Sequence, residues 1–340
     1  MITIARAAVD EVRGATRASD LHGALRDALR LEHATIPLYL GAYLSIRPGT
    51  NTVVADLLRS VVVEEMLHCT IVANLITALG GRARIDAADM VPDYAQPLPL
   101  GGPGGLRARL APVSREQCAL FAEIEQPEDP LARDPVGDVA TIGEFYAAVA
   151  DSVRALPGSA FAAPSAPPVV PSWFPAGEIT PITDAESAVR ALDLVVRQGE
   201  GTTSSPFEHD GDLAHYYRFR QIVEGHALVA DPAAPEGFSY TGAEIRLDAA
   251  GVYPLITDPS PDHYADDALA RRLVDQFDEC YRRLLVALDR TFAGTPEALD
   301  AAIGVMYELR LMAIAMAETP ITGGGLPPGT GVTPLWRYPG

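Results

Sequence analysis

The chain has 340 residues, of which 48% are apolar and 21% are charged, and its net charge is −19. This composition excludes wholesale disorder and predicts a substantial buried core. The negative charge opposes binding to nucleic acid or to an anionic membrane, since both require a basic surface. Three cysteines (Cys69, Cys118 and Cys280) form no paired motif, so we expect neither a disulfide framework nor a zinc knuckle.

The N-terminus lacks a basic region followed by a long apolar core, and no uninterrupted apolar run reaches membrane-spanning length. We therefore expect a soluble, cytoplasmic protein. No internal repeat has a fixed period, and no second segment could form its own core. We interpret residues 1–340 as a single domain. The sequence allows a homo-oligomer without fixing its state.

Two long helices open the chain. Apolar residues recur at helical spacing from about 21 to 46, and Asp20 is suited to cap this helix. Arg47-Pro48-Gly49 ends it. A second helix runs from about 51 to 79, where Gly80-Gly81 stops it. The short connection predicts an antiparallel hairpin.

Residues 82–137 differ, because they are rich in proline and glycine and hold only one short helical pattern, near Ser114 to Glu125. We interpret them as a long crossover between bundle helices. A third helix follows the crossover, and a proline-rich segment at 163–175 separates it from two further helical patterns. In chain order these helices are expected at about 142–156, 184–198 and 210–229.

The remaining chain is irregular at first, with room for a short hairpin around 239–256. Two amphipathic helices and a Gly/Pro tail that carries Trp336 complete it. The expected fold class is therefore all-α. It is a four-helix bundle with a long crossover, an interrupted fourth helix and two additional C-terminal helices. The predicted core helices are 21–46, 51–79, 142–156 and 184–229, and the C-terminal helices are 266–292 and 296–318.

The segment Glu64-Glu65-Met66-Leu67-His68 lies inside the apolar second helix. Residues three or four apart share a helix face, so either Glu64 or Glu65 could pair with His68. In hydrocarbon such groups are costly unless they are paired or bind a metal. The Glu-x-x-His geometry of carboxylate bundles selects Glu65.

Helices one and three each offer a carboxylate. Glu32 precedes an almost uncharged run, which favours burial over a flanking surface position, whereas His33 points away from Glu32. Glu144 stands at the start of the third helix. On its own it is better explained as an acidic residue that the helix dipole favours in the first turn.

The fourth contribution is irregular. Asp212-Leu213-Ala214-His215 has carboxylate-x-x-His spacing, and Glu200 ends the preceding helical pattern. Glu200 could pair with His215 if 201–209 form a loop inserted into the fourth helix. Either Asp212 or Glu200 completes the set, and we prefer Glu200 for its longer reach. Mixed carboxylate and imidazole ligands suit iron or manganese.

The segments LEHATIPLYLGAYLSIRPG, EEMLHCTIVANLITALGG, IGEFYAAV, QGEGT and DLAHYYRF resemble the ferritin-like domain of the iminophenyl-pyruvate dimer synthase type, which is associated with violacein- and rebeccamycin-like pigment pathways. The resemblance covers most of residues 18–325. It implies a ferritin-like fold, and it makes Asp212 a helix cap or a supporting residue. The metal ligands that it implies are Glu32, Glu65, His68, Glu144, Glu200 and His215.

We therefore expect a non-haem metal-dependent oxidoreductase, with two iron ions or else manganese. It would act with O2 or peroxide on a small organic molecule in natural-product biosynthesis. Tyr39 and Tyr43, one turn apart, could line its pocket or shuttle electrons, or could be ordinary core aromatics. The crossover 82–137 and the loop 201–209 are candidate lids. The rival functions are iron storage, a non-catalytic helical binding protein with a hydrogen-bonded polar core, and metal-assisted hydrolysis.

Overall fold

The computed structural model describes residues 4–94, 97–100, 106–127, 139–174, 177–200, 206, 212–235, 237–322 and 325–339. Within these ranges the secondary structure is nine α-helices, four short 3-10 helices and two small two-stranded sheets. The predicted all-α class is confirmed. The 3-10 helices are Ala88–Met90, Gly158–Phe161, Ala249–Gly251 and Pro261–Tyr264.

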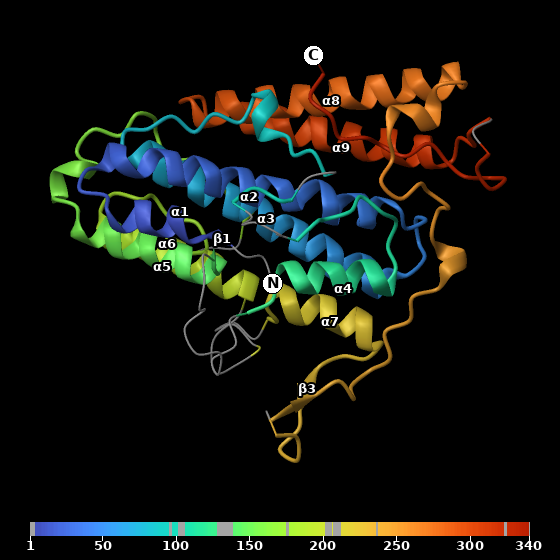
Figure 1. The fold of residues 1–340 in the computed structure, drawn as a ribbon, viewed down its shortest axis with the longest axis horizontal. Helices are drawn as coiled ribbons and strands as arrows, with labels where there is room; N and C mark the ends of the chain where they lie inside the picture. Colours follow the sequence, from blue (N-terminus) through green and yellow to red (C-terminus); the bar gives the residue numbers. More distant parts are fainter. Residues whose placement is uncertain are drawn as a thin grey trace.

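Two long helices, α2 (Ala18–Leu44) and α3 (Thr52–Ala78), form the central antiparallel pair (Figure 1). The Asp20 carboxylate accepts the backbone N–H of Arg17 at 3.0 Å, which satisfies a free donor at the start of α2. Gly80, which follows the C-cap residue Leu79 of α3, has φ +75, a conformation that glycine adopts without strain. Both helices begin and end within three residues of the predicted bounds.

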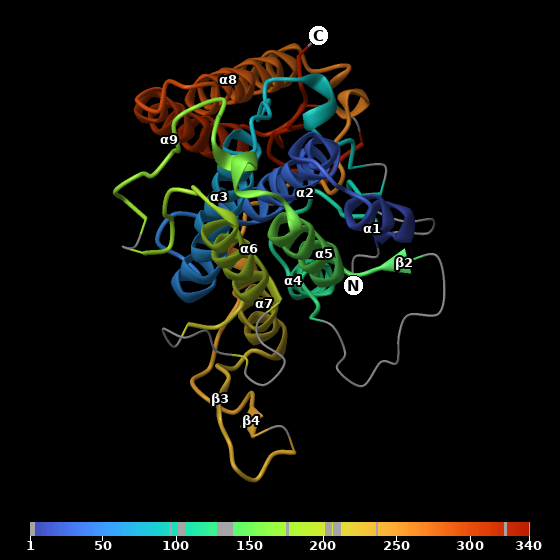
Figure 2. The same cartoon turned by 90° about the vertical axis from the view of Figure 1, so that its left-hand side faces the viewer.

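Four shorter helices form the other side of the bundle. α5 (Ile142–Ala155) packs on α6 (Ala185–Glu200), and α4 (Arg115–Ile124) packs on α7 (His215–Glu224). Figures 1 and 2 show α4 in succession with α5, and α6 in succession with α7, along the α2–α3 pair. The third and fourth bundle helices are thus both divided, at the same level of the bundle.

This arrangement corrects two expectations. Only the fourth helix was expected to be interrupted, and the helical pattern near 114–125 was assigned to the crossover. The structure places that pattern, as α4, in the bundle against α7. The reason is its apolar face, since Cys118, Phe121 and Ile124 are all buried.

The N-terminal segment was not predicted to be helical. It forms α1 (Arg6–Arg13), which packs on α5, and a strand β1 (Ile4–Ala5) that pairs antiparallel with β2 (Val139–Ala140). Val9 and Val12 bury the one apolar face of α1. A helix this short has little stability of its own, so it depends on this packing.

The C-terminal hairpin consists of α8 (Ala268–Phe292) and α9 (Ala298–Ala317), as predicted, and it lies over the α2–α3 pair (Figure 1). Trp336 of the tail packs edge-on against Phe277 and Tyr281 of α8. The sheet after α7 pairs β3 (Val229–Ala230) with β4 (Phe238–Ser239), so it precedes the predicted hairpin position of 239–256.

By length and composition alone, α3 could cross a membrane, although Glu64 and Glu65 interrupt its apolar run, as the sequence indicated. Within the protein, however, 83% of its most apolar window is buried. The apolar surface of α3 therefore faces other parts of the chain, as is typical of a helix that is enclosed by its neighbours.

Candidate metal centre

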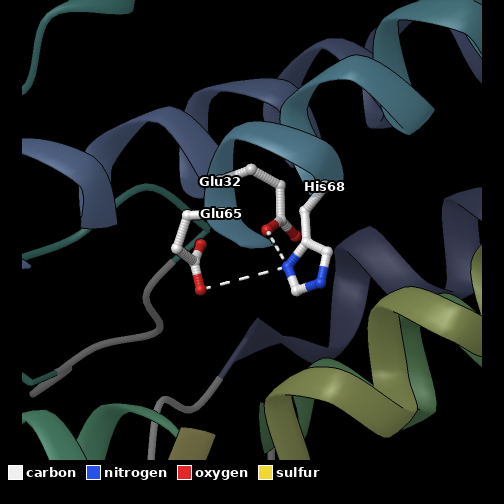
Figure 3. Close-up of side chains that lie close together, drawn as sticks. All are labelled: Glu32, Glu65 and His68. Carbon is white, nitrogen blue, oxygen red and sulfur yellow. Dashed lines mark ion pairs between the residues drawn. The ribbon is translucent and has the colours of Figure 1, made fainter. Parts of the chain in front are cut away.

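The first group of candidate ligands joins the two long helices. Glu65 and His68 lie one turn apart on α3, and Glu32 faces them from α2 (Figure 3). His68 Nδ1 lies 3.5 Å from Glu32 Oε2 and 3.9 Å from Glu65 Oε1. All three residues are at most 6% exposed. Ionisable groups at this depth are costly unless they bind one another or a cation.

The second group lies at the ends of the divided helices. Glu125 caps the C-terminus of α4, and His215 is the first residue of α7. His215 Nδ1 lies 2.9 Å from Glu65 Oε1 and 3.8 Å from Glu125 Oε2. Glu65 therefore belongs to both groups, and within each group one donor atom of every residue lies within 4.8 Å of the others. The rings of His68 and His215 stack, with their centres 5.4 Å apart.

The outer nitrogen of each imidazole is held by an acceptor. His68 Nε2 donates to Gln198 Oε1 at 3.0 Å, and His215 Nε2 donates to Glu64 Oε2 at 3.0 Å. Arg218 fixes Glu64 in turn, with Nη1 at 2.6 Å from its other oxygen. A ring whose Nε2 carries the proton presents Nδ1 to the centre, which is how metal-binding histidines are normally oriented. Glu64 thus supports His215 and is not the partner of His68.

A hydroxyl group holds each of the three central carboxylates. Thr35 Oγ1 donates to Glu65 Oε2 at 2.7 Å. Tyr146, from the start of α5, donates to Glu32, and Tyr39 of α2 donates to Glu125. These bonds fix the orientation of the acidic side chains and leave oxygens directed at the centre.

The charges of the cluster are strongly coupled. Burial lowers the pKa of His215, but its close contacts with Glu125 and Glu65 and its hydrogen bond to Glu64 outweigh burial and hold the pKa well above its ordinary value. His68 behaves in the same way, because its contacts with Glu32 and Glu65 raise its pKa against the effect of burial. Without a metal, the imidazoles therefore retain protons that balance the carboxylates.

The pKa values of Glu64 and Glu65 shift in opposite directions. Burial and the charge of Glu125 raise the pKa of Glu65. Burial also raises the pKa of Glu64, but its contacts with His215 and Arg218 prevail and lower it. The charged form of Glu64 is thus favoured beside the centre, whereas that of Glu65 is disfavoured and would be stabilised by a bound cation.

The residues fit a metal. His215 Nδ1 is fully buried and has no hydrogen-bond partner, since its contact with Glu65 is close but poorly aligned for one. An unsatisfied buried nitrogen is costly, and a cation among these donors would satisfy it. Three carboxylates with two imidazoles form a donor set suited to iron, manganese or zinc.

A small cavity of about 40 Å³ adjoins the cluster, and its walls include Glu65, Glu125 and Tyr146. Gly199 at the end of α6 also lines it, and a Cβ there would lie 3.4 Å from Glu125 Oε2. This volume accommodates a few molecules of the size of water. The cavity admits dioxygen or peroxide, but it is too small for an aromatic molecule.

The structure brings four of the six predicted ligands together: Glu32, Glu65, His68 and His215. Glu200 ends α6, but its side chain lies outside the described part of the chain. Asp212, the alternative, is described and exposed. The loop 201–209 is described only at residue 206, so its proposed role as a lid stays a prediction.

Glu144 lies elsewhere, which corrects its assignment as a ligand. Its carboxylate accepts the backbone N–H of Thr141 at 3.0 Å and pairs with Arg6 at 3.1 Å. Thr141 Oγ1 accepts the N–H of Glu144 in return, so the two residues form a capping box at the start of α5.

Replacing Glu144 by alanine should therefore lower stability and leave metal content unchanged. The expected loss is about 0.3–1 kcal/mol, the usual contribution of an acidic residue in the first turn of a helix. Thermal melting and metal quantification on the same samples measure the two effects. A variant of normal stability that has lost metal would restore Glu144 as a ligand.

The two tyrosines differ in their surroundings. Tyr39 is fully buried and donates a hydrogen bond to Glu125. Tyr43 is half-buried, and Arg310 Cζ lies over its ring, 5.8 Å from the ring centre. His33 is not part of either group. It hydrogen-bonds to the carbonyl of Met90 and to the hydroxyl of Tyr281, and burial lowers its pKa to about 4.

Sequence reasoning missed Glu125. A signal for it exists, because Glu125 follows Phe121 and Ile124 on the pattern that became α4, one turn beyond the first of them. Helical spacing relates residues on one helix, but it does not show that the end of α4 meets the start of α7. The contribution of Glu125 therefore emerges only from the fold.

Fold and site together define a helical-bundle protein with a buried carboxylate–histidine centre. A family model described as ferritin-like matches residues 25–224, more than half of the chain, and the chain belongs to that family. The crystal structure of a ferritin-like protein from Caulobacter vibrioides is similar, with a TM-score of 0.59 and 23% sequence identity. The match covers 86% of this chain and 94% of that one, and it shows a shared fold. No curated protein sequence matches the chain.

Proposed function

We propose that the chain is a non-haem di-metal oxidoreductase, with iron as the preferred metal and manganese as the alternative. It would use dioxygen or peroxide to oxidise a small organic molecule. The observation that carries the proposal is Glu65, whose carboxylate belongs to both Glu/His groups. A shared carboxylate suits two closely spaced cations, as in the carboxylate centres of helical bundles.

Each group would hold one ion. Glu32, Glu65 and His68 would bind the first, and Glu65, Glu125 and His215 the second. When bound, the ions would exchange electrons with the oxidant, and the protein would supply a shaped, largely dry environment.

The surrounding side chains would orient the ligands and hold protons. Burial raises the pKa of Tyr39 and of Tyr146 well above the ordinary value, so both hydroxyls keep their protons and donate them in hydrogen bonds. Tyr146 would thus fix Glu32, and Tyr39 would fix Glu125. The catalytic role expected for Tyr39 remains part of this proposal. Tyr43 instead lies against Arg310 and lines the space beneath α9.

The reaction class rests on the sequence resemblance to the iminophenyl-pyruvate dimer synthase type. That resemblance supports an organic substrate from natural-product biosynthesis. Because the cavity beside Glu65 holds only a few water-sized molecules, the organic substrate would react from outside it. The cavity itself would receive the oxidant.

The same cavity favours a second candidate, a ferritin-like protein that binds and oxidises ferrous iron with no organic substrate. Iron and a small oxidant are the only reactants of that process, and both fit the available space. The size of the assembly separates this candidate from the first, because storage cages are very large oligomers.

Anaerobic loading with Fe(II) followed by exposure to O2 tests the proposal. We expect about two iron ions per chain, an absorbance change on oxidation, O2 uptake, and a small assembly by light scattering. Protein that takes up no stoichiometric metal would show that the cluster is a hydrogen-bonded core network. O2 uptake by a cage-sized particle would favour iron storage. Turnover of an ester or amide with no O2 uptake would favour hydrolysis.

A further inference from the structure

A large apolar cavity of about 490 Å³ lies between the α2–α3 pair and the α8–α9 hairpin. Figures 1 and 2 show this hairpin as a separate layer over α2 and α3. The walls of the cavity come from all four helices and are largely aliphatic, and they include Leu40, Val63, Leu285 and Met306. The volume falls in the range of about 300–1,000 Å³ that is typical of small-molecule sites.

A smaller, more polar recess of about 180 Å³ adjoins one end of this cavity. Tyr43, Leu44 and Arg310 line both spaces, so they form the junction. Arg47 also lines the recess, and its guanidinium stacks 4.3 Å from the ring centre of Tyr253. The combined space is apolar at one end and carries guanidinium groups at the other.

The guanidinium groups are available to a ligand. In the described part of the chain, no carboxylate lies within ion-pair distance of Arg47 or Arg310. Asp56 is the acidic side chain of the recess, and Arg59 pairs with it at 3.3 Å. In a chain of net charge −19, Arg47 and Arg310 make this end of the apolar space locally positive.

This space is separate from the metal centre. His33 and Met66 line the apolar cavity, whereas their chain neighbours Glu32 and Glu65 line the small cavity at the cluster. No residue lines both. The α2–α3 pair therefore divides the two, and a ligand between α3 and α9 does not touch the metal ligands.

We propose that this space binds an amphipathic carboxylic acid, a molecule with a flexible apolar chain and one anionic group. The aliphatic walls bury the chain, which the hydrophobic effect favours, and the Arg310 and Arg47 guanidiniums bind the carboxylate. Trp173, which is 43% exposed, and Tyr307, which is 65% exposed, lie at its edge.

The distribution of charge favours a free acid over two other occupants, a second copy of the chain and an anionic membrane. A second copy placed symmetrically on this face would bring two arginine-bearing recesses together, and like charges oppose such contact. The whole chain is strongly acidic, which opposes docking on an anionic membrane. A free acid meets neither objection, since it brings one negative charge to the positive end of the cavity.

Fluorescence titration with cis-parinaric acid, followed by displacement with dodecanoate or dodecan-1-ol, tests the proposal on the full chain. We expect saturable binding at one site per chain, and displacement by dodecanoate at a concentration at least about tenfold below that of the alcohol. Equal displacement by the two competitors would overturn the assignment of an anionic ligand.

Variants locate the site. R310E should weaken binding at least about tenfold, whereas R272E, an equal charge change at an exposed position of α8, should leave it unchanged. L288W fills the apolar cavity and should abolish binding. Metal content should stay the same in all three variants. Unchanged binding in R310E and L288W would overturn the proposal.

Two further outcomes would assign the face to another occupant. Flotation of the protein with anionic phosphatidylserine vesicles, without binding of the free acid, would indicate a membrane contact. A concentration-dependent doubling of mass that L311R abolishes would indicate a second copy, because Leu311 on α9 is 68% exposed.

Discussion

Replacing Glu65 by glutamine is expected to reduce bound iron from about two ions per chain to well below one. Glu65 is the only residue that the two groups share, so its loss leaves each ion with one carboxylate and one imidazole. Glutamine keeps the shape of the side chain and can still accept from Thr35, which lies 2.7 Å away. The fold should therefore persist. Metal quantification with circular dichroism on the same sample measures both properties.

Matched variants make this result specific. Replacing Glu125 by glutamine should remove about one ion, because Glu125 belongs to one group only. Glu144→Gln is the control, since that carboxylate caps α5 and should leave iron content unchanged. Full iron occupancy in the Glu65→Gln variant would contradict the shared site.

The affinity for metal should rise with pH, and binding should release protons. The raised pKa values of His68 and His215 favour the protonated imidazoles in the metal-free protein, and a metal must displace those protons. The dissociation constant should thus fall by about tenfold per pH unit for each proton released, until the pH passes the raised pKa values.

Calorimetry in buffers of different ionisation enthalpy measures the protons released. Manganese(II) is a suitable probe because it binds carboxylate and imidazole ligands and resists oxidation better than ferrous iron. Affinity that is flat between pH 6 and 8, with no buffer dependence of the heat, would show that the imidazoles are already neutral in the metal-free protein.

The long helices and their ligands could be predicted from the sequence because periodicity is a local property. The three-residue spacing of Glu65 and His68 places them on one face of α3, and both are buried as expected. Glu32 was recognised from the uncharged run that follows it. In these helices the pattern of apolar residues determines which side faces the interior.

The errors arise where another local rule or a long-range contact decides. The sequence Thr141-Ile142-Gly143-Glu144 is itself a capping-box signature, and that role explains Glu144 better than metal binding does. Glu125 was missed because its contact with His215 joins residues 90 positions apart, at the ends of two short helices. The cavity beneath α9 likewise depends on how two hairpins pack together, which single-helix patterns do not specify.

The division of the third and fourth bundle helices has a mechanical consequence for the centre. Glu32, Glu65 and His68 project from the interior of 27-residue helices, so their spacing inherits the stiffness of continuous hydrogen-bonded turns. Glu125 and His215 stand at helix ends, where the adjoining chain sets the direction of the backbone. The two Glu/His groups thus differ in stiffness. If the radius or coordination of a bound metal changed, Glu125 and His215 on the α4–α7 side would move to accommodate it. The ligands on α2 and α3 would keep their positions.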